Sequence, residues 1–313
     1  MEDKSNQMKI FRGLQELSSD APCAVTIGTF DGIHRGHRLI IEKLIKVARD
    51  RDLQTALLTF DPHPRQVLLG PDKVKLLTTT EEKLQLLRQF PLHYVGVLEF
   101  NRPFAQLPYR QFVRDILIER LQIKVLVIGY DHRFGKDRQG SYENLLKLSK
   151  EWGFELYRVN PLAEGEQVIK SSHIRELLLK GDVQEANHLL GHRYFLSGKV
   201  IKGRLLGKEI DFPTANLQVT HSAKLIPADG VYAVDVEVEG RFFKGMMNIG
   251  YRPTLNHSTE KSIEVHIHHF DRDIYGQIIT VYFKERLRDE IKFPNLKALI
   301  EQLKQDRERS LKI

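Results

Sequence analysis

The stretch Val25-Thr-Ile-Gly-Thr-Phe-Asp-Gly-Ile-His-Arg-Gly-His37 decides the fold of the first half of the chain. It predicts a buried strand over 23–27, a glycine-punctuated loop, and then a helix whose apolar residues recur at helical spacing over 40–48. A glycine-rich turn that leads into a helix N-terminus offers free backbone N–H groups and the positive end of the helix dipole. Both favour the binding of a phosphate group. His34 and His37 are three residues apart, so both rings can face the same anion.

Four further apolar runs of strand length follow, and helical patterns separate them. The helical pattern over 81–89 is preceded by a capping box, in which Thr79 and Glu82 have the required spacing. A second helical pattern covers 112–120. Strands that alternate with helices predict a parallel sheet with helices on both faces. The expected strands after the first are 55–60, 94–98, 125–129 and 155–159.

Three segments with polar and aromatic residues, 28–37, 61–64 and 130–135, each follow one of these expected strands. In parallel sheets, ligands bind outside the carboxyl ends of the strands. We therefore expect the three segments to form one site. Two prolines stiffen the second segment, and Phe60 just before it offers a face for stacking.

The bulk properties describe a globular chain. Its 313 residues allow two domains of ordinary size, and contents of 41% hydrophobic and 28% charged residues are not those of a disordered chain. No apolar run approaches the ~18 residues that a membrane span needs, and the polar N-terminus lacks the apolar core of a signal peptide. The single cysteine, Cys23, excludes an internal disulfide, and we expect a cytoplasmic protein.

The formal net charge of +7 raises the question of nucleic-acid binding. The basic residues are scattered among acidic ones, and no stretch interleaves many Lys and Arg with stacking aromatic residues. A basic surface of this kind also suits phosphorylated ligands. We therefore expect neither a nucleic acid nor a membrane as partner.

The character of the chain changes near residue 185. A helical pattern over 176–190, broken at Gly181, ends the α/β alternation, and short extended runs separated by turns replace it. Such runs closed by one helix predict a small antiparallel β-barrel. We therefore expect an α/β domain over 1–185 and an all-β domain over 186–313. The expected strands are 195–202, 231–238, 242–249, 263–269 and 278–283, and the closing helix after Pro294 is expected to turn Leu296, Leu299, Ile300 and Leu303 towards the core.

Two patterns in the second half carry chemistry. Gly203 and Gly207 precede the segment Phe212-Pro-Thr-Ala-Asn216, and glycines permit a close approach of the backbone to phosphates. In that segment the Thr214 hydroxyl and the Asn216 carbonyl are oxygen ligands that suit Mg²⁺.

The second pattern is strict alternation over 262–268, which places Glu264, His266 and His268 on one face of a strand. A solvated strand face is the plain alternative to a functional role for Glu264. The two histidines also have the spacing of a metal-binding pair, although no third ligand is evident.

Six segments resemble, in order, the motifs of the bacterial bifunctional riboflavin kinase/FMN adenylyltransferase (FAD synthetase) family. The resemblance covers nearly the whole chain. It implies a Rossmann-like nucleotidyltransferase domain, followed by a riboflavin kinase barrel with a terminal helix. The segments are HxGH at 34–37, FxPHP at 60–64, GxDFxFGxxRxG at 129–140, ISSTxIR at 169–175, FPTAN at 212–216 and NIGxRPT at 248–254.

The same resemblance implies the activities and the residues that carry them. The barrel would phosphorylate riboflavin to FMN with ATP and Mg²⁺, and the first domain would join FMN to the AMP part of a second ATP, forming FAD and releasing pyrophosphate. The implied catalytic residues are His34, His37 and Arg175 for the transfer and Glu264 as the base of the kinase. The implied metal ligands are Thr214 and Asn216. The implied flavin- and nucleotide-binding residues are Gly28, Phe30, Asp31, Gly36, Phe60, Asp131, Phe134, Ser171, Ser172, Gly203, Gly207, Lys208 and Arg252.

Four positions depart from the family pattern. His132 replaces the usual Phe and Lys170 the usual Ser in the first domain, while Lys208 replaces Arg and Asp211 replaces Gly in the second. These departures leave open the alternative that one of the two activities is lost. The net charge of +7 leaves open a second alternative, a non-enzymatic regulator that binds flavin or RNA.

Overall fold

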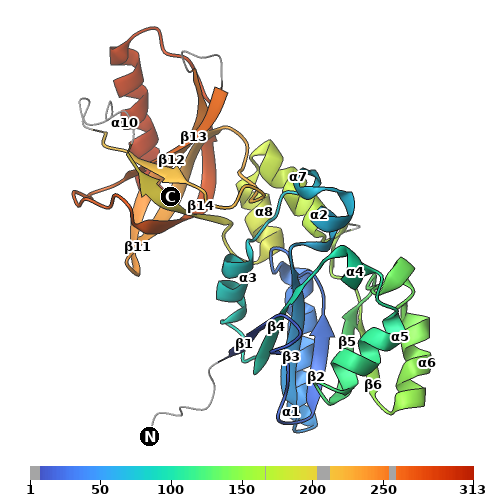
Figure 1. Cartoon of the computed structure of the whole chain (residues 1–313). Coiled ribbons are helices and arrows are strands. Elements are labelled where there is room, and N and C mark those ends of the chain that lie inside the picture. Colours follow the sequence, from blue (N-terminus) through green and yellow to red (C-terminus); the bar gives the residue numbers. More distant parts are fainter. Residues whose placement is uncertain (1–7, 166, 203–211, 254–258) are drawn as a thin grey trace, which may run out of the picture. The chain divides into compact units, whose positions relative to one another are not determined.

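The computed structural model describes residues 8–165, 167–202, 212–253 and 259–313 (Figure 1). The chain divides into two compact units, Met1–Lys170 and Ser171–Ile313. Each unit has its own sheet, and each is described by itself.

The first unit is built on six parallel strands in the order β1-β4-β3-β2-β5-β6. From β2 the chain passes outward through β3 and β4 on one side, and then through β5 and β6 on the other. The strand order therefore reverses between β2 and β5, which is where parallel sheets bind ligands. The strands are β1 (Lys9–Arg12), β2 (Cys23–Ile27), β3 (Gln54–Asp61), β4 (Tyr94–Glu99), β5 (Ile123–Gly129) and β6 (Glu155–Val159).

The five expected strands are confirmed, and β1 is an addition. It pairs with β4 at the edge of the sheet, with Lys9 opposite Tyr94, and only Phe11 among its residues is buried. A four-residue strand with one buried side chain carries no alternation that distinguishes it from a loop.

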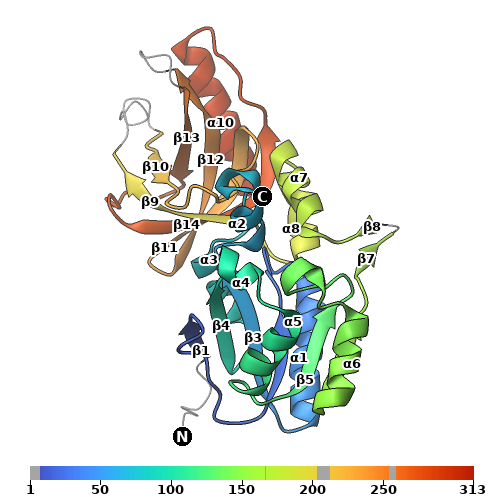
Figure 2. The same cartoon turned by 45° about the vertical axis from the view of Figure 1, so that its right-hand side comes forward.

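Helices cover both faces of this sheet (Figures 1 and 2). The capping box is confirmed: Glu82 N donates to Thr79 Oγ1 at 3.2 Å, and Thr79 N donates to Glu82 Oε2 at 2.8 Å. The expected helix over 112–120 is instead the end of a short α-helix followed by a π-helical segment. The elements are α1 (Arg35–Asp50), α2 (Pro64–Leu69), α3 (Thr80–Leu87), α4 (Arg102–Ala105), α5 (Tyr109–Phe112) and α6 (Tyr142–Trp152), the π-helix η2 (Val113–Ile118), the 3₁₀ turns η1 (Pro71–Lys73) and η3 (Lys136–Arg138), and a hairpin of β7 (Ala163–Glu164) and β8 (Gln167–Val168).

The core of the first unit lies on the two faces of the central strands. On one face, Val25 and Ile27 of β2 pack with side chains of η2 and α6. Because side chains alternate along a strand, α1 lies on the opposite face. Its buried side chains are Ile41, Leu44, Val47 and Ala48. The predicted apolar face over 40–48 is therefore confirmed, except that Ile41 and not Ile40 is buried.

The second unit begins with two helices, α7 (Ser171–Lys180) and α8 (Val183–Leu190), which break at Gly181 as expected. A closed antiparallel barrel follows in the order β10-β13-β12-β11-β14-β9, which confirms the predicted barrel. The strand that the sequence did not predict is the short β10, which holds the end of the FPTAN segment. The strands are β9 (Phe195–Ile201), β10 (Ala215–Gln218), β11 (Gly230–Val238), β12 (Arg241–Pro253), β13 (Thr259–Ile267) and β14 (Ile278–Arg288).

The terminal helix α10 (Leu296–Lys312) is present, but the prediction of its buried face was wrong in part. Leu296 is exposed, and the side chains that the helix buries are those of Asp306 and Ser310. Asp306 accepts hydrogen bonds from the Arg288 guanidinium at 2.7–3.1 Å, so polar contacts attach this helix to the barrel.

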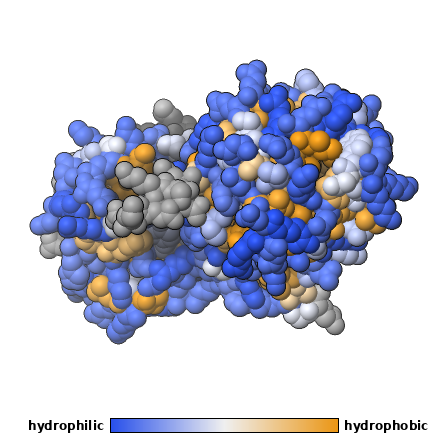
Figure 3. All heavy atoms as spheres, turned by 90° about the horizontal axis from the view of Figure 1, so that it is seen from below, coloured by the Kyte–Doolittle hydropathy of each residue, from blue (hydrophilic) through white to orange (hydrophobic). Residues whose placement is uncertain are grey.

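Hydrophilic residues predominate on the face of the molecule shown in Figure 3, and apolar residues form scattered patches there. In the described part of the chain, every helix is too short or too polar to cross a bilayer.

Candidate functional sites

The first site lies at the carboxyl ends of β2, β3 and β5, which are neighbours in the sheet. Three segments were expected to share one edge of the sheet. Residues 28–37 follow β2, residues 61–64 begin with the last residue of β3, and residues 130–135 follow β5. The loop after β2 therefore stands next to the point where the strand order reverses.

His34 and His37 form a stacked pair at the N-terminus of α1. Their ring centroids are 3.6 Å apart, with an interplanar angle of 20°, and the rings of Phe30 and His37 meet in a T-shaped contact with centroids 5.3 Å apart. His34 caps the helix, because its Nδ1 accepts the backbone N–H of His37 at 3.3 Å. In the neutral ring the proton is therefore on Nε2, which can donate to a phosphoryl oxygen.

The loop that carries these rings is tightly constrained. Phe30 and Ile33 have positive φ angles of 46° and 41°, a conformation that is costly for side chains of this size and is often found at functional sites. Gly36 makes room for the first histidine, since a Cβ there would lie 3.2 Å from His34 Cε1. A Cβ on Gly28 would lie 3.2 Å from the ring of Phe30.

Asp31, expected to contact the nucleotide, has a buried carboxylate. It accepts backbone N–H groups from Leu77 at 3.2 Å and from Thr78 at 3.0 Å. The Gly32 N–H donates to the Thr78 hydroxyl at 3.0 Å. These bonds fasten the loop after β2 to the segment before α3.

Lys83 of α3 is a residue of this site that the sequence did not indicate. Its side chain is buried, and its Nζ donates to the Thr29 carbonyl at 2.7 Å and to the Thr59 hydroxyl at 2.9 Å. Burial lowers the pKa of Lys83 to about 8. Lysines on helices are mostly exposed, so a lysine in a helical pattern gives no sign of such a position.

Phe60 and Phe134, both expected to bind the flavin, belong to one aromatic cluster. Phe60 contacts Phe104 at a centroid distance of 6.0 Å, Phe104 contacts Phe112 at 6.0 Å, and Phe112 contacts Phe134 at 4.9 Å. Phe60 of β3 and Phe134 of the segment after β5 are thus linked through the rings of Phe104 and Phe112. Such a partly buried aromatic cluster suits a planar ligand.

His132, which replaces the usual Phe, lies next to this cluster, with its ring 5.5 Å from that of Phe134. Burial lowers the pKa of His132 to about 4, so the ring is neutral at pH 7. Its Nε2 has no hydrogen-bond partner among the described residues. Asp131 beside it is exposed.

The ISSTxIR-like segment crosses the boundary between the two units. Lys170 ends the first unit, and α7, which begins at Ser171, carries Ser172 and Arg175 in the second. The two serines lie in the first turn of the helix.

The second site lies on the barrel, where the structure brings three predicted residues together. The Thr214 hydroxyl donates to Glu264 Oε2 at 3.2 Å, and Asn216 of β10 pairs directly with Glu264 of β13. Hydroxyl, amide and carboxylate oxygens are the donor set that Mg²⁺ prefers. The described residues contain no group of three His, Cys, Asp or Glu that could hold a metal, so a metal here would depend on Thr214 and Asn216.

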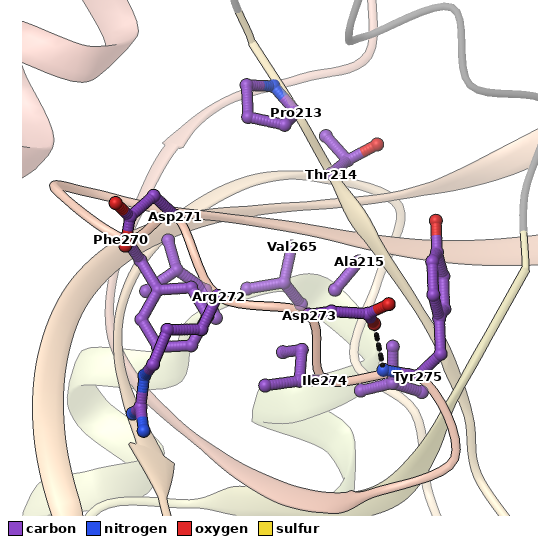
Figure 4. A pocket seen from close by; sticks show the side chains of 12 residues that line it. Pro213, Thr214, Ala215, Val265, Phe270, Asp271, Arg272, Asp273, Ile274 and Tyr275 are labelled. Carbon is purple, nitrogen blue, oxygen red and sulfur yellow. Dashed lines mark hydrogen bonds between the residues drawn. The ribbon is translucent and has the colours of Figure 1, made fainter.

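A pocket of about 500 Å³ opens beside this cluster (Figure 4). Its apolar floor comes from Ala215, Val265 and Ile267, and its wall from the loop that follows β13. In that loop the Tyr275 N–H donates to Asp273 Oδ1 at 2.9 Å. The remaining lining residues are Val200, Pro213, Thr214, Phe270, Asp271, Arg272 and Ile274.

His266 and His268 are bonded within the protein, to different groups. His266 Nδ1 lies 2.8 Å from the Pro213 carbonyl, and His268 Nε2 lies 2.8 Å from Ser310 Oγ on α10. The interpretation of these histidines as a metal-binding pair therefore gains no support.

Five of the predicted residues lie wholly or partly outside the part of the chain that the structure describes. Gly203, Gly207, Lys208 and Asp211 lie outside the described residues. Arg252 lies in β12, opposite Glu260, and only its backbone is described.

Comparison with known proteins matches each half of the chain to a known family. The family model described as FAD synthetase matches residues 16–173, and the one described as riboflavin kinase matches residues 190–313. The chain is 37% identical over 303 residues to a bifunctional riboflavin kinase/FMN adenylyltransferase from Escherichia coli (strain K12), and the match covers 96% of each chain. A protein of the same description from Bacillus subtilis (strain 168) is 37% identical over 297 residues, which cover 93% of this chain and 92% of that protein.

Among solved structures, a crystal structure described as a macrolide-efflux protein from Streptococcus pneumoniae is similar over the whole chain. The TM-score is 0.88 and the sequence identity is 31%, with 97% of this chain and 98% of that chain covered.

Proposed function

This chain belongs to the bifunctional riboflavin kinase/FMN adenylyltransferase family, and we propose that it makes FAD from riboflavin in two ATP-dependent steps. The observation that carries the proposal is that one chain holds both sites: the stacked histidines after β2, and the Thr214–Glu264 pair beside the barrel pocket. Macrolide efflux, named for the Streptococcus pneumoniae structure, has no counterpart in the two family matches, which both name enzymes.

In the kinase step, Glu264 takes the proton of a riboflavin hydroxyl as the γ-phosphoryl group of ATP arrives. The Thr214 hydroxyl, 3.2 Å from Glu264 Oε2, holds this carboxylate in place. Thr214 and Asn216 are the side chains that would hold Mg²⁺, and the ion when bound would neutralise charge on the ATP phosphates. The barrel pocket is the place for the apolar part of the flavin.

In the transfer step, the FMN phosphate attacks the α-phosphorus of a second ATP and displaces pyrophosphate. The phosphate is already a nucleophile at neutral pH, so catalysis consists of positioning and of stabilising charge. His34 donates from Nε2 to a phosphoryl oxygen, and the ring of His37 stacks against the ring of His34. Arg175 neutralises the triphosphate, and Ser171 and Ser172 hold it by hydrogen bonds.

We assign residues 1–185 to the transferase activity and 186–313 to the kinase activity. The FAD synthetase match ends at 173 and the riboflavin kinase match begins at 190, so this boundary lies between them. Both steps consume ATP, a nucleotide of the cytoplasm, and we propose that the enzyme works there.

A chromatographic time course tests the proposal. Purified protein is incubated with riboflavin, ATP and Mg²⁺, and FMN and FAD are resolved over time. We expect FMN to rise first and FAD to follow. FMN alone would assign only the kinase activity and direct attention to Lys170 and His132.

If no flavin nucleotide forms from riboflavin, FMN is supplied directly. FAD would then mean that only the kinase is silent, with Asp211 the first residue to examine. No product from either substrate would contradict the proposal, and RNA binding that weakens steeply with salt would then favour the regulator.

A further inference from the structure

The FPT segment that leads into β10 has a second attachment besides the Thr214–Glu264 bond. One residue before Thr214, the Pro213 carbonyl lies 2.8 Å from His266 Nδ1. His266 and Glu264 are on the same face of β13, two residues apart. The segment is therefore held to one strand at two successive residues, Pro213 and Thr214.

The direction of the His266 bond follows from its partner. A carbonyl oxygen can only accept, so His266 must carry a proton on Nδ1. The ring is buried, and the ring of Phe212 packs on it at a centroid distance of 5.4 Å. Proline cannot offer an N–H to the barrel ladder, so its carbonyl is the only backbone group by which this residue can be fixed.

A second histidine supports the strand behind this contact. Ser310 Oγ of α10 lies 2.8 Å from His268 Nε2 and 2.9 Å from the Arg307 carbonyl. The rings of His268 and His266 meet at 5.2 Å in an edge-on contact. The terminal helix thus contacts His268 through Ser310, and His268 packs against His266.

We propose that His266 is a positioning residue for the kinase reaction, which holds the Pro213 carbonyl so that the Thr214 hydroxyl stays beside Glu264. The inference rests on the proposed kinase function. A displacement of about 1 Å in a reacting group can cost two orders of magnitude in rate. Loss of the bond should therefore lower kcat for FMN formation by about 10- to 100-fold, with a smaller change in KM.

Three substitutions separate this role from simple packing. In His266→Asn, the side-chain amide places an N–H near the position of Nδ1, whereas in His266→Gln it lies near Nε2. His266→Leu keeps the volume and has no donor. We expect kcat to stay within about threefold of wild type for Asn and to fall about 10- to 100-fold for Gln and Leu.

The chain provides an internal control, because FAD formation from supplied FMN takes place in the other site. We expect it to stay within about twofold of wild type in all three variants. A kcat for FMN formation in His266→Leu equal to that of wild type would overturn the inference. So would a His266→Asn variant as slow as His266→Leu while melting at the wild-type temperature.

Should the variants lose stability, a double-mutant cycle decides. If His266 acts through Thr214, adding His266→Leu to Thr214→Val should lower kcat for FMN formation by less than about twofold more. If the two substitutions instead lower kcat independently, so that their effects multiply, the inference is overturned. A wild-type protein that forms no FMN would instead contradict the proposed function, and this inference with it.

Discussion

At the scale of single residues, His34 combines two roles that can be separated. Its Nδ1 caps α1 by accepting the His37 N–H, which leaves the proton of the neutral ring on Nε2. An aspartate at this position would cap the helix equally well but would offer no N–H to a phosphate. Histidine meets both needs in one side chain.

His34→Asn tests this division of roles. Asparagine is a good N-cap, so the free energy of unfolding should change by less than about 0.5 kcal/mol. The asparagine side chain is too short to place an N–H at the position of His34 Nε2, so we expect FAD formation from FMN to fall by about 10²- to 10³-fold. His34→Leu, which removes the cap as well, is the matched control. An undiminished rate in His34→Asn would exclude His34 from charge stabilisation.

Lys83 gives a pH-dependent prediction. Its pKa is about 8 in the folded protein, against 10.5 for the exposed side chain. Between these values the unfolded chain holds a proton that the folded chain has lost, so the contribution of Lys83 to stability rises with pH from about 8 to about 10.5. Each unit of pKa difference corresponds to about 1.4 kcal/mol.

Urea unfolding of wild type and Lys83→Met over pH 7–11 measures this contribution. The stability of wild type relative to the variant should increase through that window, because methionine does not titrate. Parallel curves for the two proteins would show that Lys83 titrates normally. Any other group with a shifted pKa is present in both proteins and cancels in the difference.

At the scale of elements, α10 is attached to the barrel mainly by polar contacts. Its buried Asp306 accepts hydrogen bonds from the Arg288 guanidinium through both oxygens. Gln302, also in α10, donates to the same carboxylate at 3.0 Å from within the helix. Lys244 donates to the Leu311 carbonyl at 2.6 Å. A bidentate pair of this kind is directional, so it fixes the position of the helix along the barrel as well as its distance from it.

Asp306→Ala is expected to lower the free energy of unfolding of the second unit by about 2–4 kcal/mol, because it leaves the partly buried Arg288 without its partner. Asp289→Ala is the control. Asp289 pairs with Arg286 at 2.7 Å but is largely exposed, and its loss should cost less than about 0.5 kcal/mol. Equal effects of the two substitutions would show that α10 does not depend on the buried pair.

The sequence predicts elements well where a period repeats over several residues. The sheet of the first unit and the barrel of the second follow from such periods. The short strands β1 and β10 do not, since four residues carry too little alternation, and β10 follows directly on the Pro213 segment. The prediction that Leu296 faces the core was wrong, because hydrophobic spacing gives no sign that Asp306 attaches this helix to the barrel by polar contacts.

The candidate sites divide in the same way. Histidine spacing predicted that both rings can face one anion, and the structure shows in addition that they stack. The family motifs pointed to Thr214 and Glu264 separately, and the structure adds the hydrogen bond between them. Lys83 and the partners of His266 and His268 depend on tertiary packing between segments distant in sequence, and nothing local marks them.

At the scale of the whole molecule, one chain combines two enzymes, in which the product of the barrel is the substrate of the parallel-sheet domain. The residues proposed for the two activities do not overlap: Ser171, Ser172 and Arg175 of α7 are proposed for the transferase, although α7 lies in the second unit. The two activities should therefore be separable by single substitutions in their own sites.

The most direct test of this claim is a mixing experiment. Glu264→Gln should adenylylate FMN but make no FMN, and His34→Asn should make FMN but little FAD. Neither variant alone should then convert riboflavin to FAD, whereas an equimolar mixture should, because released FMN can pass from one protein to the other. A Glu264→Gln variant that still makes FMN at the wild-type rate, or a mixture that accumulates FMN without FAD, would contradict the account.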